Sequence, residues 1–288
     1  MISKIKYHYP THSVKLFNNI EICYMDEGKG KQTLLFIHGM AYYGNVWFQQ
    51  IEELKQHYRC IAIDLPGCGL SSRGDYHYSM LFFSEVIAKF CAKLQLDEII
   101  LCGHSMGGHV GIVTALRYPP LVKQLIAIAP SGFEQFAPAE IAIYKGMLSF
   151  GNFFISNQMQ LTTSLQQSFY KMPASGKKMI DDLVAILNSD DLNHWRNMVD
   201  KCIEGMLNEQ VFHLLKFIQC PVLAIFGNHD TLIPNVFIHP SSTLQVATMA
   251  CKEIYNSKLV MIAEAGHAVF MEQPGEVNAE IKKFIEGN

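Results

Sequence analysis

A serine between two glycines gives the strongest chemical signal in the sequence. Ser105 lies within Gly103-His-Ser-Met-Gly107, directly after the short apolar run Ile99 to Cys102 and just before a helical pattern that begins near Met106. A G-x-S-x-G segment between a strand and a helix is typical of a nucleophilic serine whose hydroxyl is exposed on a sharp turn above a sheet. The glycines leave room for such a turn. The alternative is a glycine-rich turn that holds an incidental serine.

The elements around this turn predict a mostly parallel sheet. Two apolar stretches flank Asn18-Asn19, a pair that tolerates positive φ, and they predict an N-terminal β-hairpin. Short continuous apolar runs, typical of strands covered on both faces, alternate with helical patterns in the rest of the chain. The runs are Thr33–His38, Cys60–Asp64, Ile99–Cys102, Leu125–Ile128, Pro221–Phe226 and Leu259–Ile262, and the helical patterns are Met80–Leu94, Met106–Arg117 and Pro274–Ile285.

The alternation stops once, between Pro130 and Cys220. About 90 residues there read as mostly helical, without a linker rich in Gly, Ser or Pro that would make them an independent domain. We therefore predict an α/β core of residues 1–130 and 221–288, with helices on both faces of the sheet, and an inserted helical cap of residues 131–220.

With these elements in place, the chain resembles the α/β-hydrolase family over nearly its whole length except the cap. The family orders its catalytic residues Ser, acid, His. Asp230 ends Gly227-Asn-His-Asp230 after one late apolar run, and His267 ends Ala263-Glu-Ala-Gly-His267 after the last. The resemblance implies that Ser105 is the nucleophile, His267 the base and Asp230 the acid.

Each assignment has a competitor in the sequence. Glu134 is the alternative acid, because some family members carry the acid after the preceding strand. His229 is a weaker candidate for the base, and Glu264 is expected to be solvated. Asp230 could also simply cap a turn.

The resemblance also implies an oxyanion hole. In the family, the residue after His-Gly and the residue after the nucleophile donate backbone N–H groups to the developing negative oxygen. Here these residues are Met40, in His38-Gly39-Met40, and Met106. The His38 side chain is expected only to brace the loop.

The predicted reaction is hydrolysis of a small ester-like substrate through an acyl-enzyme, as in the esterases and lipases of the family. A serine nucleophile argues against the dehalogenases and epoxide hydrolases of this fold, which attack with Asp. Hydrolysis of a carbon–carbon bond in a vinylogous diketone is the runner-up, because such enzymes share the Ser-Met-Gly-Gly turn of Ser105–Gly108. A slow-turnover small-molecule receptor is an alternative of another class.

The expected substrate is hydrophobic, because the cap has few charges and many Phe and Met residues. The candidate substrate-binding residues are Phe133, Phe136, Met147 and Trp195. Packing of these side chains onto the core is an equally good interpretation. The reaction needs no organic cofactor and no metal.

Composition excludes other classes of function. The chain has 288 residues and a net charge of -3, which offers no field to attract nucleic acid or anionic lipid. The eight cysteines are scattered without CxxC pairs and are expected to be buried, reduced thiols. No apolar run approaches the length of a spanning helix, and the first residues carry no signal sequence, so we expect a cytoplasmic protein without stable membrane insertion.

Overall fold

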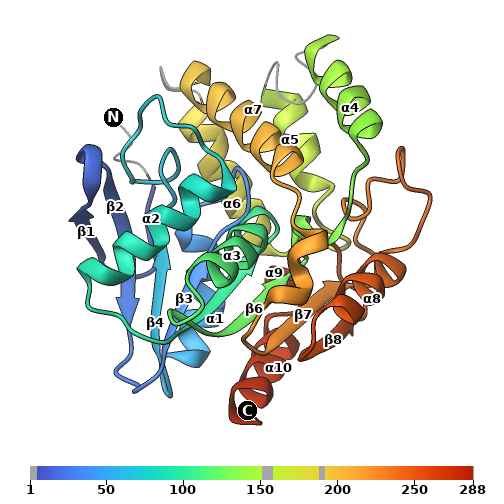
Figure 1. Ribbon diagram of the computed structural model, residues 1–288. Coiled ribbons are helices and arrows are strands. Elements are labelled where there is room, and N and C mark those ends of the chain that lie inside the picture. Colours follow the sequence, from blue (N-terminus) through green and yellow to red (C-terminus); the bar gives the residue numbers. More distant parts are fainter. Residues whose placement is uncertain (1–4, 151–157, 188–191, 288) are drawn as a thin grey trace.

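One mixed sheet of eight strands runs through the computed structural model, which describes residues 5–150, 158–187 and 192–287 (Figure 1). The strands are β1 (Thr11–Lys15), β2 (Glu21–Glu27), β3 (Thr33–Ile37), β4 (Arg59–Ile63), β5 (Ile99–His104), β6 (Val122–Ile128), β7 (Val222–Gly227) and β8 (Ser257–Ile262). Their order in the sheet is β1-β2-β4-β3-β5-β6-β7-β8. The α/β fold class predicted from the sequence is confirmed.

The N-terminal hairpin is also confirmed. Strands β1 and β2 pair in antiparallel fashion, with Val14 opposite Ile22. Asn18 and Asn19, in the short 3-10 helix η1 (Phe17–Asn19), have φ values of 49° and 59°. Asparagine tolerates this left-handed region better than most residues, which explains why the chain turns here.

In the order of the sheet, every strand pair from β4–β3 to β7–β8 is parallel, as the continuous apolar character of these strands predicts. All six residues of β5 are buried, because helices cover both faces of the sheet. The carboxyl ends of parallel strands meet at one edge of a sheet, so the loops after β3, β5, β7 and β8 come together there.

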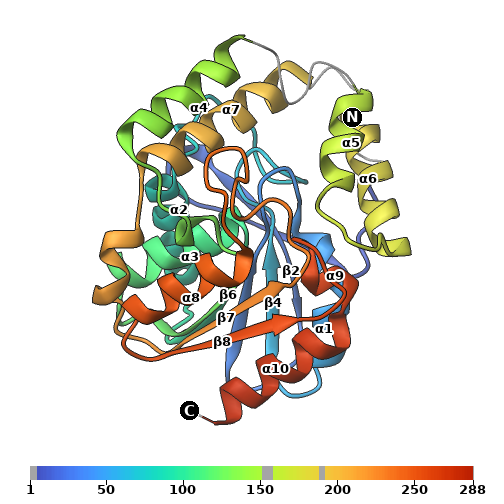
Figure 2. The ribbon, with the colours of Figure 1, turned by 90° about the vertical axis from the view of Figure 1, so that its right-hand side faces the viewer.

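Helices form a layer on each face. Figure 2 shows α2, α3 and α8 on one side of the sheet and α1 and α10 on the other. Their bounds are α1 (Phe48–Leu54), α2 (Met80–Lys93), α3 (Met106–Arg117), α8 (Thr243–Glu253), α9 (Val269–Glu272) and α10 (Pro274–Glu286). Helix α8 begins with a capping box, in which the Ser242 side chain and the Gln245 side chain each bond the other residue's backbone N–H. This box gives the loop between β7 and α8 a fixed end.

In the segment between β6 and β7, which we call the helical insert, the described residues form four further α-helices. They are α4 (Pro138–Phe150), α5 (Gln158–Gln166), α6 (Ala174–Leu187) and α7 (Leu192–Asn208), flanked by the 3-10 helices η3 (Ser131–Phe133) and η4 (Phe212–Phe217). In Figure 2 the insert lies beyond the edge of the sheet that holds the carboxyl ends of the parallel strands. The described part of the insert contains no strand.

Two further predictions concern properties of the whole chain. All eight cysteines are free, seven of them buried and Cys251 half-buried, as expected for unpaired thiols. None of the helices in the described residues combines the length and the apolar character that crossing a membrane requires.

Candidate active site

Ser105 occupies the sharp turn between β5 and α3. Its φ of 54° and ψ of -117° lie outside the regions that ordinary residues prefer, so the turn holds it in a strained conformation. The neighbouring glycines are required because there is no room for a side chain at their positions. A Cβ on Gly103 would lie 2.2 Å from the Gly107 carbonyl oxygen, and a Cβ on Gly107 would lie 2.3 Å from that of Ile37. The sequence pattern therefore reflects real contacts at this turn.

Backbone hydrogen bonds fix the turn on both sides. The Ser105 N–H donates to the Ile128 carbonyl of β6 over 2.9 Å, and the Ser105 carbonyl accepts the His109 N–H over 3.1 Å. His104 links the turn to the loop after β8, because its Nε2 lies 3.0 Å from the His267 carbonyl oxygen. Burial holds the pKa of His104 well below its usual value, so this imidazole is neutral and donates from Nε2.

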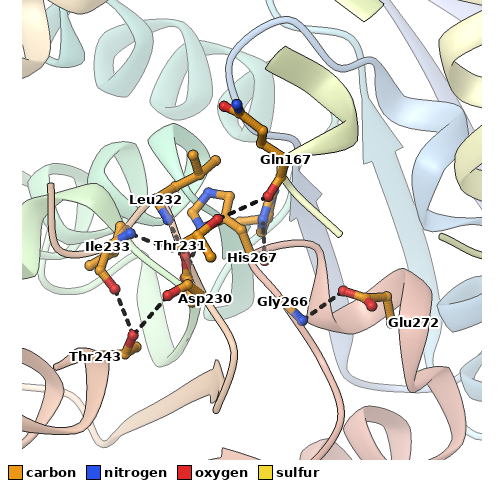
Figure 3. Close-up of polar contacts among 10 residues, drawn as sticks. Gln167, Asp230, Thr231, Leu232, Ile233, Thr243, Gly266, His267 and Glu272 are labelled. Atoms are coloured by element: carbon orange, nitrogen blue, oxygen red, sulfur yellow. Dashed lines mark hydrogen bonds and ion pairs between the residues drawn. The ribbon is translucent and has the colours of Figure 1, made fainter. Parts of the chain in front are cut away.

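His267 and Asp230 form a buried pair. His267 Nδ1 donates to Asp230 Oδ2 over 2.9 Å, and the two side chains are only 5% and 0% exposed. Figure 3 shows that the other oxygen, Oδ1, accepts the N–H groups of Leu232 and Ile233, at 2.8 and 3.1 Å. The Thr243 hydroxyl donates to the Asp230 and Ile233 carbonyls, which ties this loop to the start of α8. These bonds fix the carboxylate and select the tautomer of His267 that leaves Nε2 free to accept a proton.

The competing residues bond elsewhere. Glu134 Oε1 lies 2.6 Å from His239 Nδ1, and Glu264 forms an exposed ion pair with Lys171 at 2.8 Å. The His229 ring stacks on Tyr170 with centroids 3.9 Å apart. Of the three carboxylates considered in the sequence, the one bonded to His267 is Asp230.

Met40 and Met106 are the two residues predicted to form the oxyanion hole. Met40 follows β3 and lines the cavity described below, and Met106 is the first residue of α3, where a backbone N–H has no acceptor within the helix. The His38 ring is buried and braces this loop. Its Nδ1 donates to the Gly39 carbonyl over 2.8 Å, and its Nε2 accepts the Leu65 N–H over 3.0 Å. Burial lowers the pKa of His38 to about 4, which keeps the ring neutral for this pair of bonds.

A cavity of about 390 Å³ opens beside these residues, lined by Ser105, His267, Met40 and parts of the helical insert. Of the four predicted substrate-binding residues, Phe136 lines it. Phe133 and Trp195 are not among its lining residues. Phe133 is 1% exposed and packs on Phe226, and Trp195 is 5% exposed within the core. Both side chains therefore serve packing, and the side chain of Met147 lies outside the described residues.

The sequence analysis did not identify Glu272 as part of the site. Glu272 Oε1 accepts the Gly266 N–H over 2.7 Å, directly before His267 (Figure 3). Its Oε2 accepts the N–H groups of Tyr170 and Lys171, at 3.0 and 2.7 Å. One carboxylate thus joins the His267 loop to the helical insert.

Two more bonds strengthen this junction. The Ala268 N–H donates to the Ser168 carbonyl over 2.8 Å, and the Thr231 hydroxyl donates to the Gln167 carbonyl over 3.1 Å. Glycine is required at 266, since a Cβ there would lie 2.7 Å from the Tyr170 nitrogen. We call residues 167–171 the tether, because they bind the insert to both loops of the His267–Asp230 pair.

The described residues contain no group of three or more His, Cys, Asp or Glu side chains that could hold a metal ion.

Comparison with known proteins settles the family. The sequence profile of the alpha/beta hydrolase fold matches residues 32–274. The chain belongs to the α/β-hydrolase family. Among curated α/β-hydrolase relatives, a pimeloyl-[acyl-carrier protein] methyl ester esterase of Wigglesworthia glossinidia brevipalpis is 26% identical, over 90% of this chain and 95% of its own length.

A second relative is the (E)-2-((N-methylformamido)methylene)succinate hydrolase of Acinetobacter baylyi, which is 23% identical over 95% of this chain and 97% of its own. Among solved structures, a probable hydrolytic enzyme of Pseudomonas aeruginosa PAO1 superposes with a TM-score of 0.84 at 19% identity, covering 97% of this chain and 95% of the other. That structural similarity concerns the α/β-hydrolase fold alone. Together the relatives place this chain among hydrolases.

Proposed function

We propose that this α/β-hydrolase is a serine esterase that cleaves a carboxylic ester of a small, largely hydrophobic substrate through an acyl-enzyme. The observation that carries the proposal is the buried His267–Asp230 bond of 2.9 Å at a cavity that Ser105 also lines. The esterase relative supports the ester as the bond cleaved. We also propose that residues 131–220 act as a cap over a core of residues 1–130 and 221–288.

In the proposed mechanism the Ser105 oxygen attacks the carbonyl carbon while His267 Nε2 takes the hydroxyl proton. Asp230 stabilises the imidazolium that forms. The negative oxygen of the tetrahedral intermediate accepts the N–H groups of Met40 and Met106, each worth about 3–4 kcal/mol by analogy with single-donor deletions.

Collapse of the intermediate breaks the bond to the leaving alcohol, which receives the proton from His267. The acyl group stays on Ser105 as an ester. A water molecule then loses a proton to His267 and attacks this ester, and the acid product leaves as the proton returns to Ser105.

A fluorophosphonate probe together with p-nitrophenyl esters tests the proposal. Wild type should be labelled rapidly and should turn over acyl chains of four to eight carbons, and Ser105→Ala should lose both labelling and turnover. Ser13→Ala, on the exposed face of β1, is the matched control and should keep both. Labelling without turnover of any ester would favour a receptor or a carbon–carbon bond hydrolase over an esterase, and turnover that survives Ser105→Ala would refute the mechanism.

A further inference from the structure

Glu134 is a buried carboxylate in the wall of the candidate active site. It is 7% exposed and lines the same cavity as Ser105 and His267. It follows η3 directly, and η3 is held against the nucleophile turn because the Ser131 N–H donates to the Ser105 carbonyl over 3.2 Å. The position of Glu134 is therefore coupled to that of Ser105.

The two oxygens of Glu134 differ in their partners. Oε1 accepts the Asn235 N–H over 2.8 Å and lies 2.6 Å from His239 Nδ1. Within the described residues, both bonds end on Oε1, and Oε2 receives none. An ionised carboxylate oxygen can accept further hydrogen bonds, so Oε2 can accept one from a donor group of a substrate in the cavity.

The charges near this wall are negative in sum. His239 lies between two carboxylates, since its Nε2 is 3.3 Å from Glu140 Oε2. One imidazolium can balance only one of these two charges. None of the described residues lining the cavity is a Lys or Arg. The sequence between Lys145 and Lys171 contains no charged residue, so this stretch of the insert adds no cation either.

The rest of the cavity wall includes apolar side chains such as Phe136, Ile203 and Leu207, so it suits an uncharged part of a substrate. A substrate carboxylate placed here would lose its hydration, would meet no cation and would face Glu134. A hydroxyl or ammonium group would instead donate to Oε2. Discrimination of this kind depends on repulsion as much as on attraction.

We propose that Glu134 sets the substrate class of the proposed esterase: it selects esters whose remote end is uncharged or carries a hydroxyl or ammonium group, and it rejects esters that carry a carboxylate there. This inference rests on the proposed function and adds a specificity residue to it.

The test uses p-nitrophenyl esters of four six-carbon acids: hexanoate, 6-hydroxyhexanoate, 6-aminohexanoate and adipate, which ends in a carboxylate. A second series carries the same end groups on the alcohol part of hexanoate esters, so that either half of the substrate can lie beside Glu134. Values of kcat/KM are measured at pH 8 for wild type, Glu134→Gln and Glu140→Gln. Glu140 also contacts His239 but does not line the cavity, which makes it the matched control.

In at least one series we expect wild type to cleave the carboxylate ester at least about tenfold less efficiently than its uncharged counterpart, a difference of about 1.4 kcal/mol. The hydroxyl or ammonium ester should be cleaved at least as well as the uncharged one. Glu134→Gln should raise the ratio of carboxylate to uncharged ester about fivefold or more, because it removes the charge and keeps the shape. Glu140→Gln should leave this ratio within about twofold of wild type.

Two results would overturn the inference alone: equal cleavage of carboxylate and uncharged esters by wild type in both series, or a ratio unchanged by Glu134→Gln. If wild type cleaves no ester in either series, the proposed function fails and the inference fails with it.

Discussion

Glu272 gives the sharpest test of how the fold supports the loop of His267, the proposed base. Its carboxylate accepts three backbone N–H groups, those of Gly266, Tyr170 and Lys171, at 2.7 to 3.0 Å. A hydrogen bond to a charged acceptor contributes about 1.5–3 kcal/mol. Glu272→Gln replaces one carboxylate oxygen by an amide NH₂, so at least one bond is lost and the others lose the assistance of the charge. We expect the free energy of unfolding to fall by about 3 kcal/mol.

The same change should affect catalysis through His267, which follows Gly266. With its loop less firmly held, His267 should be aligned with Ser105 for a smaller fraction of the time. We expect kcat for a p-nitrophenyl ester to fall about tenfold or more, with KM changed much less, because the side chain is not in the cavity wall. Urea unfolding and steady-state kinetics measure the two effects.

Glu276→Gln is the matched control, since this glutamate is exposed in the first turn of α10, close to Glu272 in the chain. It should leave both quantities near the wild-type values. A folded Glu272→Gln variant with kcat within twofold of wild type would show that the His267 loop does not depend on this carboxylate.

Three other predictions follow from the site and the core. Asp230→Asn should lower kcat about 10⁴-fold in ester hydrolysis without unfolding the protein, because the amide favours the wrong tautomer of His267; retained activity would move the acid role to another carboxylate. Gly107→Ala should destabilise the fold by more than about 4 kcal/mol in urea unfolding, since the new Cβ would lie 2.3 Å from the Ile37 carbonyl oxygen; wild-type stability would refute that contact. The free energy of unfolding should decrease between pH 7 and pH 5, and in His109→Asn this decrease should be about 2 kcal/mol smaller than in wild type.

The sign of the His109 effect follows from its pKa. Burial lowers the pKa of His109 to about 4, whereas an unfolded histidine titrates near 6.5. Between these two values the unfolded chain binds more protons, so this residue's contribution to stability is lost as the pH falls from about 6.5 to about 4. Asp64 acts in the opposite direction, because burial raises its pKa to about 6, but its effect is the same in wild type and variant. An unchanged pH dependence in His109→Asn would contradict the prediction.

The sequence predicted the parts of the fold whose signals are local. Continuous apolar runs identified the parallel strands, because these strands are buried on both faces. The spacing of Gly103, Ser105 and Gly107 identified the turn, because a Cβ at either glycine would clash with nearby backbone atoms. Helices α1 and α8 were not predicted, since they have only 7 and 11 residues and their amphipathic patterns are short.

What the sequence could not predict depends on contacts between distant residues. Phe133 and Phe136 are three residues apart and have the same chemistry, yet one packs on Phe226 and the other lines the cavity. The contact between Glu134 and His239 joins residues 105 positions apart in the sequence, and the hydrogen bond between Glu272 and Tyr170 joins residues 102 positions apart. Composition and periodicity carry no information about such long-range contacts. The packing of the insert on the core determines them.

The tether has a consequence for redesigning the enzyme. Four hydrogen bonds that hold it to the loops of Asp230 and His267 and to Glu272 use main-chain atoms of the tether: the carbonyls of Gln167 and Ser168 and the N–H groups of Tyr170 and Lys171. Side chains at these positions can therefore be randomised without removing a single one of these bonds, provided that proline is avoided at 170 and 171. Because Gln167 and Ser168 also face the cavity, a library at these two sites would vary substrate scope while the catalytic geometry stays anchored.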